Sequence, residues 1–255
     1  MKTSTSISMP SEVNSYLRAS ELQKEGKKVR AMVIINPGNP TGQCLSEANL
    51  RERLKFCYNE ILVLLGDDVY QQNIYQDEMS VPLSAPRRFL MDMGSPFSKE
   101  VQHMGLMVSP PKPGDISYDQ FARESKGILE SLRRRAKIMT DGFNSCKNVV
   151  CNFTQGAMYS FPQIRLPAGA LQAAKQAGKV PDVFYCLWLW IWTERRVKES
   201  PKYDFVLALL ISSCKLIPLV DFDSVFHLRT TILPAQEEMP EIMDSFKKFN
   251  DECMT

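Results

Sequence analysis

A short apolar run that stops at two Asn-Pro steps constrains this chain more than any other feature. Residues Met32 to Ile35 are apolar, and they are followed by Asn36-Pro37-Gly38-Asn39-Pro40-Thr41-Gly42. This pattern predicts a buried strand that ends in a rigid, sharply turned loop. Each proline fixes its own φ and biases the preceding asparagine toward extended geometry, so both asparagine side chains should be held in place. Open α/β sheets bind ligands at such strand ends.

The residues after this loop predict a helix and a second strand. Ser46 can cap a helix over residues 47–58 that carries Leu50, Leu54 and Cys57 on one face. The apolar run 61–66 has no polar alternation, which predicts a strand buried on both faces. A strand, helix and strand in this order predict a parallel pair. We therefore expect Asn39 and the segment 67–70 at the same edge of the sheet.

The second half of the chain predicts a smaller α+β domain. A long helix should begin at Ser117, with a Ser117/Gln120 capping box, and run through an apolar face. That face consists of Phe121, Ile128, Leu132, Met139 and Phe143. Further predicted elements are a hairpin turning at Gly156 (148–153 and 158–164), helices over 168–178 and from 183 after an Asp182 cap, a strand over 225–233 and a helix over 237–254. We expect domains at 1–115 and 116–255, the second interrupted by an atypical, tryptophan-rich segment at 188–224.

Composition excludes several classes of partner. The 255 residues carry a net charge of +2, with 44% hydrophobic and 24% charged residues, which is typical of a globular protein and argues against a nucleic-acid or membrane partner. Seven cysteines lie at irregular spacings without a CxxC pair, so we expect reduced, buried thiols and no metal site. The start of the chain does not read as a signal peptide, so a cytoplasmic location is expected, with a mitochondrial one as the alternative.

Three separated motifs resemble one enzyme family. The segments 36–42, 66–70 and 226–230 are similar to those of the pyridoxal-phosphate-dependent aminotransferases of fold type I. The flanking segments 43–50, 71–76 and 156–162 resemble alanine aminotransferase of the plant type. This resemblance implies a partial PLP-transferase fold of the α/β class: an incomplete parallel-sheet large domain and a smaller α+β C-terminal domain.

The resemblance also implies roles for four residues and a cofactor, pyridoxal 5′-phosphate. Asp67 matches the buried carboxylate that keeps the pyridine nitrogen protonated, so that the ring can act as an electron sink. Asn39 and Tyr70 match the donors to the 3-oxygen of the ring. Arg229 matches the arginine that holds the substrate α-carboxylate through two parallel hydrogen bonds. The implied reaction converts L-alanine and 2-oxoglutarate to pyruvate and L-glutamate.

The sequence departs from the family where the reacting group should lie. Residues 97–102 match the family, but His103 follows Gln102 at once, and the turn that holds the Schiff-base lysine is missing. Neither Lys99 nor Lys215 has the surroundings of that lysine. The half of the family sequence that precedes Lys27 also has no counterpart here. We therefore expect no catalytic lysine, weak or lost cofactor binding and no transfer activity.

Two alternatives stay open. One is a non-catalytic partner that dimerises with intact aminotransferase subunits or with itself. The other is the product of a defective gene model, because the joins at 102/103 and near 188 and 224 are abrupt.

Overall fold

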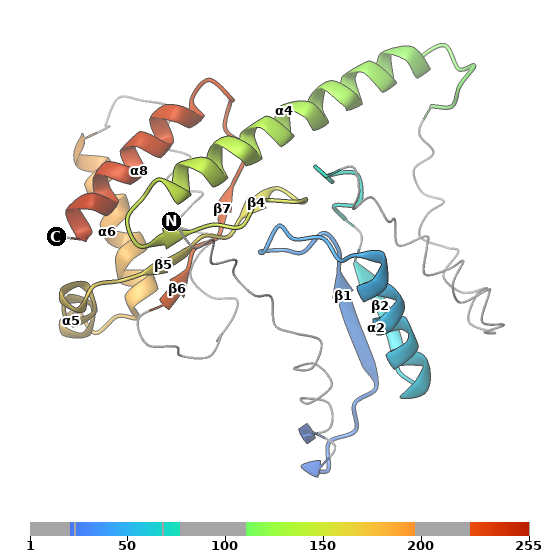
Figure 1. Ribbon diagram of the computed structural model, residues 1–255, viewed down its shortest axis with the longest axis horizontal. Helices are drawn as coiled ribbons and strands as arrows, with labels where there is room; N and C mark the ends of the chain where they lie inside the picture. The colour runs from blue at the N-terminus through green and yellow to red at the C-terminus, as the bar shows by residue number, and fades with distance from the viewer. Residues whose placement is uncertain (1–20, 23, 68, 77–110, 197–224, 255) are drawn as a thin grey trace, which may run out of the picture.

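The structure is a computed structural model that describes residues 21–22, 24–67, 69–76, 111–196 and 225–254 (Figure 1). Lys99, Lys215 and the Gln102–His103 junction lie outside the described residues. The elements in chain order are β1 (Ala31–Ile35), α2 (Glu47–Asn59), β2 (Val63–Asp67), α4 (Tyr118–Asn144), β3 (Val149–Val150), β4 (Tyr159–Ser160), β5 (Gln163–Arg165), α5 (Ala168–Gln176), α6 (Pro181–Arg196), β6 (Val225–His227), β7 (Thr230–Thr231) and α8 (Met239–Cys253).

The β1–α2–β2 unit confirms the predicted parallel pair. β1 and β2 lie in parallel register, from Ala31 opposite Val63 to Ile35 opposite Asp67. The Ser46 side chain accepts a hydrogen bond from the Asn49 backbone N–H at 3.1 Å, so Ser46 caps α2 as expected. The face of α2 predicted to be apolar is buried. Asn39, in the loop after β1, and Asp67, the last residue of β2, therefore lie at the same edge of the sheet.

The prediction that the second strand is buried on both faces is wrong. β2 begins at Val63, and Val63 and Leu65 are 58% and 52% exposed. Val33, opposite Leu65 on β1, is 61% exposed, whereas Ile34 on the other face is 3% exposed. Because the described residues supply two strands and one covering helix, one face of this small sheet packs against α2 and the other faces solvent.

The β1–α2–β2 unit is the first packing unit of the structure, and the elements from α4 to α8 form the second. The second packing unit contains the main core. α4 packs against α8, α5 packs against α6, and α6 contacts α8 (Figure 1). Phe249 of α8 is fully buried, and the rings of Tyr185, Trp188 and Trp192 surround it at centroid distances of 5.0, 6.0 and 5.9 Å. Such aromatic contacts stabilise a core beyond the area that they bury.

These contacts place the start of the tryptophan-rich segment in α6. Its first residues, 188–196, continue α6 without a break, and Leu189 and Thr193 are buried. Pro181 rather than Asp182 opens this helix, because proline is favoured in the first helical turn. Residues 197–224 lie outside the described residues, and the domain division at 115/116 stays a prediction.

The structure confirms the antiparallel pairing predicted across Gly156, because Val149 lies opposite Ile164 and Val150 lies opposite Gln163, whereas the predicted strand 225–233 is interrupted. β3 pairs with β5, β5 pairs with β6, and β4 pairs with β7, all antiparallel. The segments 159–165 and 225–231 run side by side but form two ladders. Pro162 interrupts the first segment, because proline has no N–H to donate, although its carbonyl accepts from the Leu228 N–H at 3.0 Å. Arg229 therefore lies in a break between β6 and β7.

The long helix α4 is confirmed, but its first half is not a core face. Ser117 has helical backbone angles and makes no side-chain cap, and Gln120 instead donates to the Glu124 carboxylate at 2.8 Å. Phe121 and Ile128 are 37% and 61% exposed. Figure 1 shows the reason: the first half of α4 extends beyond α8. The buried residues of α4 are Leu132, Ala136, Met139, Thr140 and Phe143.

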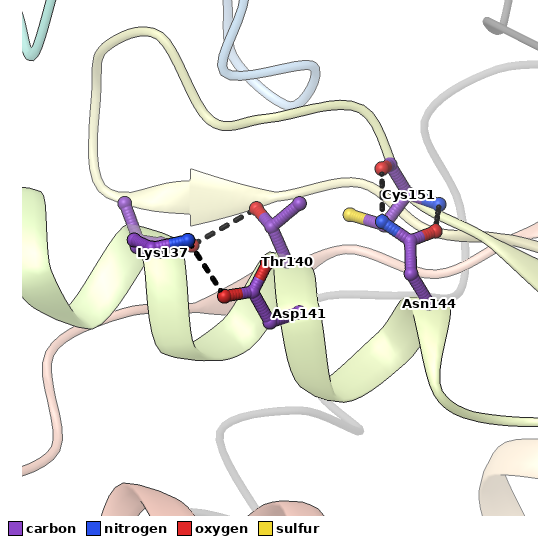
Figure 2. Close-up of polar contacts among 6 residues, drawn as sticks. Lys137, Thr140, Asp141, Asn144 and Cys151 are labelled. Carbon is purple, nitrogen blue, oxygen red and sulfur yellow. Dashed lines mark hydrogen bonds and ion pairs between the residues drawn. The ribbon is translucent and has the colours of Figure 1, made fainter. Parts of the chain in front are cut away.

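One side chain joins the C-terminal end of α4 to the residue that follows β3. Asn144 donates to the Cys151 carbonyl and accepts from the Cys151 N–H, both at 2.9 Å (Figure 2). On the outside of the helix Lys137 pairs with Asp141 at 2.9 Å. No helix among the described residues is long and apolar enough to span a bilayer.

Candidate functional site

The loop after β1, residues 36–42 (the Asn-Pro loop), is rigid because its own polar groups are satisfied. Asn36 is buried; its N–H donates to the Asp67 carbonyl at 3.1 Å and its Oδ1 accepts from the Leu45 N–H at 2.9 Å. The Gly38 N–H donates to the Gln43 carbonyl at 2.9 Å, and the Gly42 N–H donates to the Gly38 carbonyl at 2.8 Å. These bonds hold Asn39 at the tip of the loop.

Two glycines let the Asn-Pro loop touch the second packing unit. Gly42 has a φ of +64°, and its carbonyl accepts from the Gln155 and Gly156 N–H groups at 2.8 and 3.0 Å. A Cβ at Gly42 would overlap the Tyr159 carbonyl oxygen. A Cβ at Gly156 would lie 2.7 Å from Pro37 Cγ. Any larger residue would therefore force these two backbones apart.

The segment that follows β2 joins the same junction. The Tyr75 N–H donates to the Gln155 carbonyl at 2.8 Å, and the Ala157 N–H donates to the Asn73 carbonyl at 2.9 Å. The buried Tyr75 hydroxyl donates to the Ala157 carbonyl. Segments 36–46, 70–76 and 153–160 thus form one hydrogen-bonded unit that fixes both strand ends of β1–β2 against β4.

Four polar side chains meet at this junction, and we refer to them as the four-residue cluster: Asn39, Tyr70, Tyr159 and Arg229. Arg229 Nη1 donates to Asn39 Oδ1 at 3.2 Å. The Arg229 guanidinium carbon lies 5.1 Å from the centroid of the Tyr159 ring. The Tyr159 and Tyr70 hydroxyl oxygens are 3.0 Å apart. Arg229 and Tyr159 come from the second packing unit, and Asn39 and Tyr70 come from the first.

The structure therefore brings together three of the four residues predicted for the site. Asn39 is exposed, whereas Tyr70 and Arg229 are half-buried. Asp67 ends β2 at the same edge but is exposed, and its Oδ1 accepts from the Val69 N–H at 3.3 Å. The expected burial of the Asp67 carboxylate is wrong, because among the described residues nothing covers this face of the sheet. The roles of all four residues stay predictions.

The surroundings keep Tyr70 in its neutral form. Burial, followed by the hydrogen bond with Tyr159, raises the pKa of Tyr70 to about 12, and the nearby Asp67 carboxylate adds to this effect while Arg229 opposes it. At neutral pH the Tyr70 hydroxyl therefore keeps its proton and is able to donate a hydrogen bond. His227, stacked on Phe161 at 4.8 Å, has a pKa lowered by burial, so its ring is neutral near pH 7.

Sequence reasoning missed Tyr159. The residue lies in the segment 156–162, which carried the resemblance, but the motif gave it no role. Strand pairing explains why Tyr159 lies near Arg229: Tyr159 of β4 is opposite Thr231 of β7, two residues from Arg229. That pairing joins residues 72 positions apart, so no local pattern could have predicted it.

Comparison with known proteins relates the chain to one enzyme family. The family model for aminotransferase class I and II matches residues 11–106. Glutamate–glyoxylate aminotransferase 1 of Arabidopsis thaliana is 59% identical over 290 aligned positions, which take in 92% of this chain and 56% of that protein. Alanine aminotransferase 2 of Panicum miliaceum is 36% identical, over 93% of this chain and 58% of that protein. The chain thus spans just over half the length of these relatives.

A solved structure shows the same fold. Alanine aminotransferase from Pyrococcus furiosus superposes with a TM-score of 0.51 at 20% identity, over 88% of this chain and 58% of that one. The predicted fold class, a partial α/β PLP-transferase fold, is therefore confirmed. Mitochondrial alanine aminotransferases are among the relatives, so the cytoplasmic location stays a prediction.

Proposed function

Because the chain belongs to the class I and II aminotransferases, whose cofactor is pyridoxal 5′-phosphate, we propose that its four-residue cluster binds the carboxylate of an amino acid or 2-oxo acid. The observation that carries this proposal is the 3.2 Å hydrogen bond from Arg229 to Asn39. It holds a half-buried guanidinium at the tip of the Asn-Pro loop. A guanidinium offers a planar pair of donors that matches a carboxylate.

The substrates that we propose are glutamate and glyoxylate. They follow from the name of the Arabidopsis relative at 59% identity, whereas alanine aminotransferase of Panicum miliaceum is 36% identical. Alanine and 2-oxoglutarate, which the sequence motifs implied, are the second choice. In either case Arg229 would bind the α-carboxylate, which all four of these molecules share.

The residues present fit part of the cofactor. Asn39 and Tyr70 offer donors to an anionic ring oxygen, and the Tyr70 hydroxyl is kept protonated. Asp67 would lie toward the ring nitrogen, but an exposed carboxylate is a weaker partner than a buried one because water screens its charge. When bound, pyridoxal phosphate supplies an electron sink. We propose that this chain holds the ring weakly and the substrate carboxylate through Arg229.

We also propose that the chain does not transfer amino groups by itself. Its sequence passes directly from Gln102 to His103, where the family places the lysine that attaches the cofactor and moves the proton. The comparison supports a gap inside the aligned region. The alignment with the Arabidopsis relative has 290 positions, more than the 255 residues of this chain, so part of the relative has no counterpart here.

Calorimetric titration with glutamate and glyoxylate tests carboxylate binding. Arg229→Gln should weaken both ligands at least about tenfold, because it removes the paired donors and the charge. Arg165→Gln, which changes an exposed arginine in β5, is the matched control and should bind like the wild type. Equal binding by Arg229→Gln and Arg165→Gln would contradict the proposal.

A transfer assay tests the absence of activity. The chain is incubated with pyridoxal phosphate, glutamate and glyoxylate, and glycine is measured; we expect none above the protein-free reaction. Enzyme-dependent glycine formation would refute this part of the proposal. A visible absorbance band that survives gel filtration and maps to one lysine after borohydride reduction would refute it as well.

A second proposal is that the chain pairs with an intact aminotransferase subunit. The solvent-exposed apolar residues Val33, Val63 and Leu65 on one face of β1–β2 favour it, because contiguous apolar surface marks interaction sites. Co-expression of the tagged chain with full-length glutamate–glyoxylate aminotransferase, followed by gel filtration, should give a joint peak. Two separate peaks, with this chain a monodisperse monomer, would exclude such pairing.

A further inference from the structure

Tyr159 contacts both parts of the proposed site at once. Its ring lies under the Arg229 guanidinium, with 5.1 Å between the guanidinium carbon and the ring centroid. Its hydroxyl lies 3.0 Å from the Tyr70 hydroxyl, and the two rings meet edge to face at 5.8 Å. The residue proposed to bind a carboxylate and the residue proposed to bind a ring oxygen are therefore connected through one side chain.

The backbone around Tyr159 is held from several sides. Tyr159 pairs with Thr231, and the Ile232 N–H donates to the Met158 carbonyl at 3.0 Å. The buried Thr230 hydroxyl donates to the Ser160 carbonyl at 3.2 Å. On the other side, Gly42 approaches so closely that no Cβ would fit. These contacts leave the Tyr159 side chain with a fixed direction, toward Tyr70 and Arg229.

Each contact of Tyr159 has a distinct physical effect. The face of the ring attracts the guanidinium and limits its rotation. The hydroxyl pair has a stricter consequence, because each hydroxyl carries a single proton. If Tyr70 donates its proton to a ligand oxygen, then it must accept from Tyr159. A ligand oxygen at Tyr70 thus orders both hydroxyls and, through the Tyr159 ring, the guanidinium.

We propose that Tyr159 is a positioning residue that couples the two parts of the site, so that a carboxylate at Arg229 and a ring oxygen at Tyr70 each strengthen the binding of the other. This inference rests on the proposed function. The inference extends the proposed function by assigning cooperativity to Tyr159. The contact of its ring with Arg229 and the contact of its hydroxyl with Tyr70 can be removed separately. Because coupling is reciprocal, each ligand must change the dissociation constant of the other by the same factor.

Two ligands that cannot react test this proposal. Glutarate supplies the carboxylates of glutamate without its amino group, and pyridoxamine 5′-phosphate supplies the ring and its 3-oxygen without an aldehyde. Each is titrated by calorimetry alone and in the presence of the other. The proteins are the wild type, Tyr159→Phe, Tyr159→Leu, Arg229→Gln and, as a control, Tyr58→Phe, which removes a hydroxyl from an exposed tyrosine of α2.

The two Tyr159 variants should differ in which ligand they affect. Tyr159→Phe keeps the ring, so glutarate should bind within about twofold of the wild type, while pyridoxamine 5′-phosphate should weaken about three- to tenfold. Tyr159→Leu also removes the ring and should weaken glutarate by about three- to tenfold. In both variants, and not in Tyr58→Phe, the mutual strengthening of the two ligands should disappear.

Several results would overturn the proposal, and they differ from one another. Wild-type coupling retained in Tyr159→Phe would show that the hydroxyl pair does not connect the sites. Normal glutarate binding without any binding of pyridoxamine 5′-phosphate would exclude coupling while leaving carboxylate binding intact. If glutarate bound the wild type and Arg229→Gln equally, the proposed function itself would fail. A loss of folded protein in Tyr159→Leu is separated from these results by Tyr159→Phe, which leaves the ring packing unchanged.

Discussion

Replacing Gly156 by alanine is the most direct test of the junction that holds the site together. The added Cβ would lie 2.7 Å from Pro37 Cγ and 2.8 Å from the Asn73 carbonyl oxygen, well inside ordinary contact distances. Neither neighbour can rotate away, because one is a proline ring and the other is backbone. Overpacking of this kind costs about 1–3 kcal/mol.

The loss of local hydrogen bonds adds to this cost in unfolding free energy. To relieve the overlap the backbone must shift, which stretches the bond from the Gly156 N–H to the Gly42 carbonyl and that from Ala157 to Asn73. Each is worth about 1 kcal/mol. We therefore expect Gly156→Ala to lower the free energy of unfolding by about 2–4 kcal/mol. The same shift moves Tyr159 away from Tyr70, so glutarate and pyridoxamine 5′-phosphate should lose their coupling.

Urea unfolding followed by circular dichroism measures this effect, and Gly127→Ala is its matched control. Gly127 lies on the exposed part of α4, and a Cβ there would meet nothing within 4 Å. The same substitution at that position should stabilise the protein by about 0.5–1 kcal/mol, because alanine loses less backbone entropy in a helix. A Gly156→Ala protein as stable as the wild type would refute the reasoning about the junction.

Three further predictions concern stability. Ser46→Ala should lower the free energy of unfolding by about 1 kcal/mol through loss of the α2 cap, and an unchanged urea midpoint would contradict this. Phe249→Ala should cost about 3–5 kcal/mol, because the ring is fully buried among three other aromatic rings; a thermal midpoint close to that of the wild type would contradict it. Burial raises the pKa of Cys44 to about 11 and that of Cys151 to about 12, from 9.0. Between pH 9 and the raised pKa values, the folded state keeps thiol protons that the unfolded state releases. The stability present below pH 9 should therefore decline as the pH rises. A urea midpoint that stays flat or rises between pH 8 and 10 would refute this.

The residues that the structure describes explain both why three of the predicted site residues converge and why Asp67 is exposed. Asn39, Tyr70 and Arg229 converge because the junction of three segments is complete within the described residues. Asp67 is exposed because it belongs to the open face of a two-stranded sheet, next to Val69, which is 71% exposed. The same sheet edge thus carries a hydrogen-bonded part, which we propose to bind a carboxylate, and an open part with the exposed Asp67 carboxylate.

Local sequence determined the elements whose residues interact mainly with their own neighbours. β1 begins and ends where the apolar run and the Asn-Pro steps predict, and α2 starts at the Ser46 cap. The parallel pairing of β1 and β2 followed from chain order alone, and with it the common edge for Asn39 and Asp67. These features depend on short-range hydrogen bonds, on backbone restriction by proline and on the handedness of a single crossover.

Only the tertiary structure decided what depends on distant partners. The break at Arg229 arises because Pro162, on another segment, cannot donate to the ladder. Burial of Ile34 and exposure of Val33 depend on how many layers cover the sheet, which an apolar run does not encode. Tyr159 gains its contacts with Tyr70 and Arg229 through sequence separations of 89 and 70 residues. The Asn-Pro loop therefore marks the proposed site in the sequence, but Tyr159, which contacts both Tyr70 and Arg229, is placed by the packing of β4 against that loop.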